Sequence, residues 1–246
     1  MSAPKVIVVM PALNAARTLE RTFRAIPPGI VDDVILVDDN SSDATPALAR
    51  TLPLHFIWHP HNVGYGGNQK TCYLEALHRG ADVVVMLHPD GQYEPQLIPR
   101  LIEPILRGVA DLVLGSRLAE PGAARAGGMP RYKVLANRVL TTIENRVLGT
   151  RLSELHTGYR AYSRDLLMTV PFLRNSLDYA FDSELLMQAA HFGFRITEVP
   201  ARSRYFDDAS SISFRPAAVY GLKTLWMATR LLLHRRGIWR SRRLVP

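Results

Sequence analysis

The chain has 246 residues, 47% of them hydrophobic, and a formal net charge of +8 at pH 7. A chain of this length and composition can bury a hydrophobic core, and it contains no internal repeat or low-complexity tract, so we expect one main domain with an appendage. A single cysteine, Cys72, excludes an intramolecular disulfide framework, and no apolar stretch approaches the roughly 20 residues of a membrane-spanning helix. We therefore expect a protein of the reducing cytosol without a secretory signal, with Cys72 packed in its interior.

Four apolar segments in the first half of the chain are rich in β-branched or aliphatic residues and end in polar or turn-forming residues, as buried strands do. These segments are residues 5–10, 33–37, 83–87 and 111–114. The segments between them with helical spacing of apolar residues are 18–26, 45–52, 68–78 and 96–106. Strands that alternate with helices predict an α/β fold, in which a mostly parallel sheet lies between two layers of helices.

Each predicted strand is followed at once by residues that can bind a ligand. The four strand tips are Pro11-Ala12-Leu13-Asn14, Asp38-Asp39-Asn40-Ser41-Ser42-Asp43, His88-Pro89-Asp90-Gly91-Gln92 and Gly115-Ser116-Arg117. Ligands of parallel sheets bind beyond the carboxyl ends of the strands, so we expect the four tips to converge on one crevice. Such convergence is typical of an enzyme or a nucleotide-binding protein.

The third tip carries an imidazole, a carboxylate and an amide at alternate positions, namely His88, Asp90 and Gln92. All three groups can donate a lone pair to a cation. A divalent metal that bridges phosphates needs oxygen and nitrogen ligands of this kind on a rigid strand end. The residues therefore predict a site for a divalent cation.

In this order and at these spacings, the motifs resemble the front half of a family 2 glycosyltransferase with the GT-A fold, a Rossmann-like α/β architecture. The segment from Asn62 to Gly67 also fits that pattern. Three later motifs, at residues 115–117, 157–160 and 204–206, resemble the branch of the family that charges polyprenyl or dolichyl phosphate with a sugar. The resemblance covers residues 5–215. It implies an inverting transfer from a UDP- or GDP-linked sugar to a polyprenyl phosphate, with Mn²⁺ or Mg²⁺ as the cofactor.

The resemblance implies that the first two tips form the site for the nucleotide-sugar donor. Pro11, Leu13 and Asn14 would line the nucleotide base. Val37 would pack beneath the base, and Asp39 would accept a hydrogen bond from an N–H of uracil or guanine.

Some polar residues near these tips have a plainer structural interpretation. Asp and Ser are preferred where a strand turns into a helix, and capping is the favoured role for Asp43 but not for Asp39. For Asn62 to Gly67, a turn and the close approach of a helix are favoured over a phosphate-binding loop.

The resemblance also assigns ligands to the cation. The family has an aspartate two residues before Asp90 and, in the lipid-phosphate branch, a glutamine at the position of Gln92, whereas His88 replaces the first aspartate here. Imidazole binds Mn²⁺ but is a poorer ligand for Mg²⁺, so we expect Asp90 as the main ligand and Gln92 and His88 as lesser ones. In the alternative, His88 only ends the strand and contacts the sugar.

The catalytic chemistry depends on the acceptor. The oxygens of a lipid phosphate are already ionised near neutral pH, so no general base is required and the protein must supply cations that hold the phosphate. Arg117, Arg131 and Arg204 match the family positions for this clamp, and together with Asp90 they form the predicted catalytic set.

A second hypothesis keeps the fold but transfers the sugar to a hydroxyl of a saccharide or small molecule. A carboxylate must then take the hydroxyl proton, and Asp182 and Glu184, at the start of a predicted helix, are the candidates. Their alternative role is to complement the helix dipole, with Arg160 as a structural partner. A third hypothesis is a non-enzymatic protein that binds nucleotide sugars or associates with DNA.

Two segments, 119–130 and 207–213, are predicted to be mobile loops. The predicted catalytic domain spans residues 1–215, and residues 216–246 form a basic tail in which apolar residues recur at helical spacing without any acidic residue. The apolar residues are Val219, Leu222, Leu225, Trp226, Leu232 and Leu233, and the arginines are Arg230, Arg235, Arg236, Arg240, Arg242 and Arg243.

This pattern predicts a basic amphipathic helix that lies on an anionic membrane surface, which would make the protein peripheral at the cytoplasmic membrane face. In the alternative, the apolar stripe packs on the catalytic core or on another subunit, so a homo-oligomer stays open. No base-reading motif accompanies the positive charge, and we therefore expect no nucleic acid as a partner.

Overall fold

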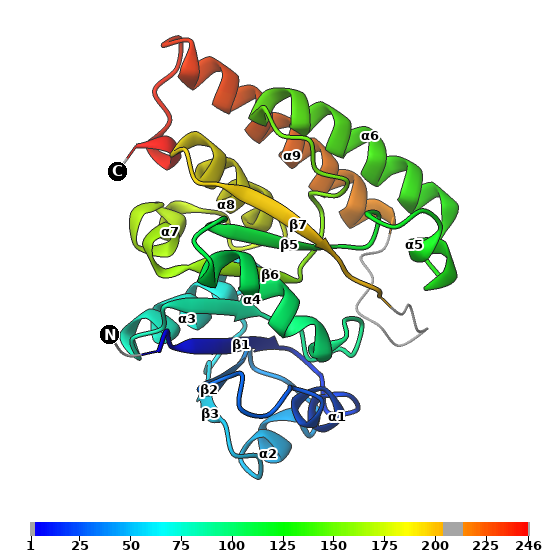
Figure 1. Cartoon of the computed structure of the whole chain (residues 1–246), viewed down its shortest axis with the longest axis vertical. Helices are drawn as coiled ribbons and strands as arrows, with labels where there is room; N and C mark the ends of the chain where they lie inside the picture. The colour runs from blue at the N-terminus through cyan, green and yellow to red at the C-terminus, as the bar shows by residue number, and fades with distance from the viewer. Residues whose placement is uncertain (1–2, 204–213, 246) are drawn as a thin grey trace.

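The structure is a computed structural model that describes residues 3–203 and 214–245. Its strands form a seven-stranded sheet in the order β3-β2-β1-β4-β6-β5-β7 (Figure 1). The strands are β1 (Val6–Ala12), β2 (Asp33–Asp38), β3 (His55–Trp58), β4 (Val83–Met86), β5 (Leu112–Ser116), β6 (Arg160–Ser163) and β7 (Ile196–Pro200). Neighbouring strands run parallel except at β6, which is antiparallel to β4 and to β5. The predicted mostly parallel α/β sheet is confirmed.

Helices cover both faces of this sheet. One face packs against α1 (Leu19–Arg24), α2 (Thr45–Ala49) and α4 (Ile98–Leu106). The other packs against α3 (Tyr65–His78), α6 (Arg131–Leu148), α7 (Arg164–Thr169), α8 (Ala180–His191) and α9 (Phe214–Arg235). Along β1, Ile7 and Val9 point into one core while Val8 and Met10 point into the other. Because both faces are buried, the strand is apolar at every position rather than at alternate ones.

Helix α3 begins three residues earlier than its apolar spacing indicates, so the prediction was wrong at this end. Gly64, with φ +86°, ends the preceding turn, and Gly66 lies in the first turn of the helix. A Cβ atom on Gly66 would lie 2.4 Å from the backbone oxygen of Ser176, so this glycine allows the helix to approach that segment closely. The turn and the close approach of a helix, which we favoured for Asn62 to Gly67, are confirmed. Cys72, in the same helix, is fully buried as expected.

The segment 119–130 contains the short helix α5 (Ala123–Ala126). Ala124 and Met129 pack with Leu118 in a small apolar cluster, so the segment is not an open loop throughout its length. The second predicted loop, 207–213, and Arg204 lie outside the described residues.

Helix α9 packs on the main body of the protein, between α6 and α8 (Figure 1). Its buried residues are Met227, Ala228 and Leu231, which belong to the same core as α3 and α8. The predicted apolar stripe, by contrast, contains exposed residues. Leu222 is 68% exposed and Trp226 is 50% exposed. The tail helix therefore has one apolar face in the core and a second one on the surface. Among the described residues, no helix combines the length and the hydropathy that crossing a bilayer requires.

Candidate active site

The four predicted tips lie at the same edge of the sheet. Strands β1, β2 and β4 are parallel, and β5 has the same direction as β4 because β6 is antiparallel to both. The first two tips are joined by a hydrogen bond from the Asp39 N–H to the Ala12 carbonyl at 2.9 Å, and the fourth tip is bound by the segment before β6, where the Thr157 hydroxyl donates to the Gly115 carbonyl at 2.7 Å. The strand ends thus lie at one edge, as predicted, and their convergence on a single crevice stays a prediction.

The first tip is fastened to the second. The Asn14 side-chain oxygen accepts a hydrogen bond from the Ser42 N–H at 2.9 Å, and the Asn14 N–H donates to the Ser41 hydroxyl at 2.8 Å. Pro11 is buried at the strand end, whereas Leu13 is 52% exposed. Leu13 is thus available to a ligand, and the backbone N–H and side-chain oxygen of Asn14 hold the two tips together. Val37 is fully buried in the core, so it supports the tip from below.

The acidic residues of the second tip all have partners. Asp39 is buried and accepts hydrogen bonds from the Val63 N–H at 2.9 Å and the Gly64 N–H at 3.0 Å, while His59 Nδ1 lies 2.9 Å from its Oδ1. A nucleotide base at Asp39 would therefore share this carboxylate with the loop that precedes α3. Asp43 accepts from Thr45 at the start of α2. Burial raises the pKa of Asp43, but hydrogen bonds from Thr45 and the Ala16 N–H together outweigh it and hold that pKa below its ordinary value.

The loop before α3 connects the second tip to the third. Its Val63 and Gly64 N–H groups bind Asp39, and the next residue, Tyr65, places its hydroxyl 3.2 Å from His88 Nε2. Asp39 and His88 therefore lie at the same edge of the sheet, connected through Val63 and Gly64 of the loop and Tyr65, the first residue of α3.

The third tip offers one carboxylate to a cation. His88 and Asp90 are partly exposed, Gln92 is buried, and the Gln92 N–H donates to Asp90 Oδ1 at 3.0 Å. Within residues 3–203 and 214–245, no three His, Cys, Asp or Glu side chains come together as a metal cluster. A cation held chiefly by substrate phosphates needs only one or two protein carboxylates, so the donor set fits such an ion and not a closed protein cage.

The two candidate bases have other partners. Asp182 accepts hydrogen bonds from the Tyr65 hydroxyl at 2.7 Å and from the Gln69 amide at 3.2 Å. Glu184 is buried, accepts from the Ser176 hydroxyl and N–H, and pairs with Arg243. Both carboxylates thus stabilise the fold around α8.

Arg160 is a structural partner of Asp182, as expected. Its guanidinium donates a hydrogen bond to the backbone carbonyl of Asp182. The fully buried guanidinium donates to the carbonyl oxygens of Thr157, Leu155 and Asp182 at 2.7 to 3.1 Å. Burial opposes its charge, but Asp182 and the surrounding tyrosines leave the pKa of Arg160 above its ordinary value.

Of the three arginines of the predicted clamp, Arg117 and Arg131 lie within the described residues, and their environments differ. The Arg117 guanidinium is buried, pairs with Glu154 and donates to the His156 carbonyl at 2.7 Å. Glu154 also accepts from Asn137 of α6 at 2.7 Å, so Arg117 and Glu154 hold α6 against the end of β5. Arg131, the first residue of α6, is exposed to solvent.

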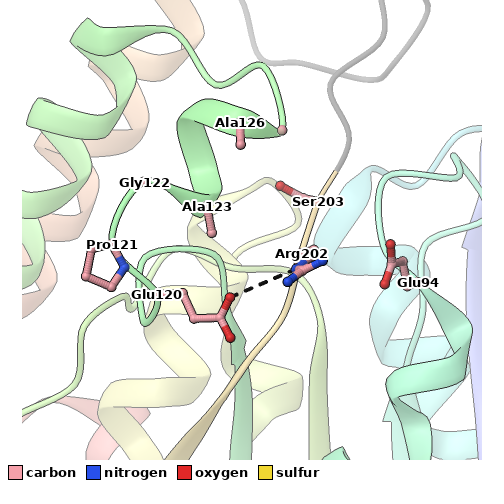
Figure 2. Close-up of a pocket in the computed structure, with 9 residues that line it drawn as sticks. Glu94, Glu120, Pro121, Gly122, Ala123, Ala126, Arg202 and Ser203 are labelled. Carbon is pink, nitrogen blue, oxygen red and sulfur yellow. Dashed lines mark ion pairs between the residues drawn. The ribbon is translucent and has the colours of Figure 1, made fainter.

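A cavity of about 660 Å³ lies beyond the ends of β5 and β7, beside the third tip. Figure 2 shows Arg202 between two acidic side chains, with its Nε 4.0 Å from the carboxylate of Glu120, while α5 presents only small residues such as Ala123 and Ala126. Glu94, on the opposite wall, follows the third tip in sequence. Neither Asp39 nor the third tip lines this cavity, which adjoins the candidate donor site.

Residues 7–170 match the profile of the family described as glycosyl transferase family 2. The chain belongs to this family. This family 2 glycosyltransferase is 30% identical over 203 residues to undecaprenyl-phosphate mannosyltransferase of Micrococcus luteus, with 80% of this chain and 82% of that protein covered. It is also 30% identical over 207 residues to polyprenol monophosphomannose synthase of Mycolicibacterium smegmatis, with 80% and 76% covered. The predicted family, and the resemblance to its polyprenyl-phosphate branch, are confirmed.

Solved structures of glucosyl-3-phosphoglycerate synthase from Mycobacterium tuberculosis share the fold of this glycosyltransferase. The complex with Mn²⁺, UDP and phosphoglyceric acid has a TM-score of 0.68 at 21% identity, and covers 97% of this chain and 80% of that chain. The complex with Mg²⁺ and UDP has a TM-score of 0.69 at 23% identity, with 97% and 81% covered. The predicted GT-A fold is thereby confirmed.

Three residues of the glycosyltransferase site were not predicted: His59, Tyr65 and Gln69. His59 follows an edge strand that the sequence pattern does not reveal, and its bond to Asp39 spans 20 residues. Tyr65 stands inside the glycine-rich motif, where a bulky aromatic residue was a signal that could have drawn attention to it.

Proposed function

We propose that this family 2 glycosyltransferase moves a sugar from a UDP- or GDP-linked donor to a polyprenyl phosphate, with inversion at the anomeric carbon. The observation that carries the proposal is the 30% identity, over four fifths of the chain, to two enzymes named for the transfer of mannose to polyprenyl phosphates. A further relative, 27% identical over 222 residues, is named UDP-N-acetylglucosamine–dolichyl-phosphate N-acetylglucosaminyltransferase, from Methanococcus voltae. The relatives thus differ in sugar and agree in the class of acceptor.

In the proposed reaction, an oxygen of the lipid phosphate attacks the anomeric carbon from the side opposite the leaving group. The bond between that carbon and the β-phosphate oxygen breaks, and the nucleoside diphosphate leaves with the electron pair. Asp90, with Gln92 and His88, would hold Mn²⁺ or Mg²⁺, which when bound supplies positive charge to the leaving diphosphate. No proton has to be removed from the acceptor.

The engagement of the two candidate bases, Asp182 and Glu184, supports this acceptor over a hydroxyl. Asp182 and Glu184 both accept hydrogen bonds from neighbouring residues, so neither is disposed to take a proton from a sugar hydroxyl. For the phosphate clamp we propose Arg131 and Arg204. Because Arg117 already pairs with Glu154, we propose that its role is to position α6, and with it Arg131.

We further propose that the outer surface of α6 and α9 docks on an anionic membrane at its cytoplasmic face. On α6, Tyr132, Leu135 and Val139 are exposed at helical spacing, on the side opposite the buried residues of that helix. On α9, Leu222 and Trp226 do the same, and the two helices lie side by side (Figure 1). The basic residues exposed on or beside these helices include Arg131, Arg138, Arg146, Lys223, Arg235, Arg236, Arg240 and Arg242. Apolar side chains flanked by arginines suit the interface of an anionic bilayer.

The first prediction concerns this surface. Leu135→Glu combined with Leu222→Glu is expected to weaken binding to vesicles containing anionic phospholipid by at least about tenfold, because two exposed apolar anchors become charged. Vesicle co-sedimentation at two salt concentrations measures the effect. Leu106→Glu, at a residue 45% exposed on the opposite helix layer, is the matched control and should bind as the unmodified protein does. Equal binding by all three proteins would contradict the proposed surface.

The second prediction tests the reaction itself. With UDP-glucose, UDP-N-acetylglucosamine and GDP-mannose offered separately, and with and without Mn²⁺, one donor should yield a lipid-linked sugar on a short polyprenyl phosphate. Mass spectrometry identifies the product, and NMR of its anomeric proton reports inversion. The matched acceptor is the same polyprenol without phosphate, which should yield no product.

Transfer to the unphosphorylated polyprenol or to a free saccharide, and not to the phosphate, would favour the hydroxyl-acceptor hypothesis. Absence of any lipid-linked product would defeat the proposed function.

A further inference from the structure

Three side chains beside the third tip form a continuous chain of hydrogen bonds. Tyr65 Oη lies 3.2 Å from His88 Nε2, and it donates to Asp182 Oδ2 at 2.7 Å. The rings of Tyr65 and His88 are stacked, with centroids 5.6 Å apart and an angle of 19° between their planes. We refer to these residues as the His88–Tyr65–Asp182 relay.

The number of hydrogens available fixes the direction of the relay. A tyrosine hydroxyl has one hydrogen to donate, and a carboxylate only accepts, so the hydrogen of Tyr65 is committed to Asp182. A tyrosine hydroxyl is protonated at neutral pH, and at 2.7 Å from Asp182 Oδ2 it has an acceptor for that hydrogen. Tyr65 can then only accept from His88, which must carry its hydrogen on Nε2. The lone pair of the neutral imidazole is therefore on Nδ1.

The surroundings of the imidazole point the same way. A Cβ atom placed on Gly158 would lie 2.8 Å from His88 Nε2, so that this side of the ring is enclosed by Tyr65 and the backbone at Gly158. The other end of the relay is fixed too, since Asp182 accepts a second hydrogen bond from Gln69 at 3.2 Å. The Nδ1 atom is the ring nitrogen left for a ligand.

We propose that Tyr65, anchored on Asp182, is a positioning residue that holds His88 in its Nε2–H tautomer and reserves Nδ1 for the divalent cation of the donor site. Histidines that bind metals commonly donate their other N–H to a fixed partner, which sets both tautomer and ring orientation. An aspartate at this position would need no such partner. The inference rests on the proposed function, because that function supplies the cation.

The tautomer can be observed without substrate. In a long-range ¹H–¹⁵N correlation spectrum, the imidazole of His88, assigned by its loss in His88→Asn, should show the pattern of the Nε2–H form. Tyr65→Phe keeps the ring but removes the acceptor, and should convert His88 to a mixture of tautomers. Tyr179→Phe removes the hydroxyl of the ring that packs on Tyr65, with centroids 4.6 Å apart, and should leave the pattern unchanged. An Nδ1–H tautomer in the unmodified protein would overturn the proposal.

Binding of Mn²⁺ alone, followed by electron paramagnetic resonance, gives the second readout. Tyr65→Phe should raise the dissociation constant about tenfold, which is the lower range for loss of a partner behind a metal ligand. In the His88→Asn background the same substitution should have no further effect, because the group that Tyr65 positions is gone. Equal weakening in both backgrounds, or none in either, would overturn the proposal.

Neither measurement uses a sugar donor or a lipid acceptor. The relay can therefore fail while transfer to polyprenyl phosphate is observed, and transfer can fail while the relay stands.

Discussion

Asp90→Asn is expected to lower kcat for sugar transfer by about two to three orders of magnitude. Among His88, Asp90 and Gln92, only Asp90 carries a negative charge, so the substitution removes the single anionic ligand for the cation while keeping the size of the side chain. Initial rates of lipid-linked product formation, at donor and Mn²⁺ concentrations that saturate the unmodified protein, measure the change. Raising Mn²⁺ further should restore only part of the activity.

The matched control is Asp165→Asn, an exposed aspartate in the first turn of α7, for which an unchanged kcat is expected. If Asp90→Asn retained more than about a tenth of the activity, the cation would have to be held by other residues, and the assigned ligand set would be wrong.

Glu154→Gln is expected to reduce the free energy of unfolding by about 3 kcal/mol, the lower end of what breaking a buried ion pair costs. Glu154 is fully buried and accepts from the Arg117 guanidinium, the Arg117 N–H and Asn137, so the substitution leaves a buried arginine without its counter-charge. For a chain of this length the melting temperature should fall by about 6–12 °C. Urea titration at pH 7 measures the free energy directly. Glu103→Gln, on the surface of α4, is the control and should change stability little.

The same variant has a pH signature. Burial raises the pKa of Glu154, but the charge and hydrogen bonds of Arg117 outweigh it, and the native pKa lies below the ordinary value. A carboxyl with a lowered native pKa stabilises the fold above its unfolded pKa, about 4.3, and loses that contribution as pH falls through the native pKa. The stability difference between the unmodified protein and Glu154→Gln should therefore be constant from pH 7 to about 5 and shrink in stronger acid. A difference that grows on acidification would contradict the assigned sign.

The parts of the fold that were predictable are those where local pattern and burial agree. Strand β4 is buried on both faces, and its uninterrupted apolar residues gave a clear signal. The edge strands β3 and β7 are only partly buried, so their apolar pattern is weak. Strand β6 begins with Arg160, whose fully buried guanidinium is satisfied by three backbone carbonyl groups. No sequence pattern predicts that a charged residue will be buried in this way.

The site shows the same contrast between features set by local sequence and features that depend on distant residues. Its tips could be predicted because each follows directly from a strand end. Their partners could not, since the carboxylate that binds Arg117 comes from 37 residues further along the chain and the one that binds Tyr65 from 117 residues further. Sequence reasoning therefore identified the residues that carry charge and chemistry, but it could not tell that Arg117 and Asp182 are already engaged by other side chains.

Helix α9 contributes Met227, Ala228 and Leu231 to the same core as the sheet, and so it cannot swing away from the body without exposing them. If its outer face rests on a bilayer, the whole molecule has a single orientation relative to the membrane plane. The height of Arg131 above the lipid headgroups would then be a fixed dimension of the protein, and the phosphate of the lipid, not the enzyme, would have to travel that distance to meet the sugar.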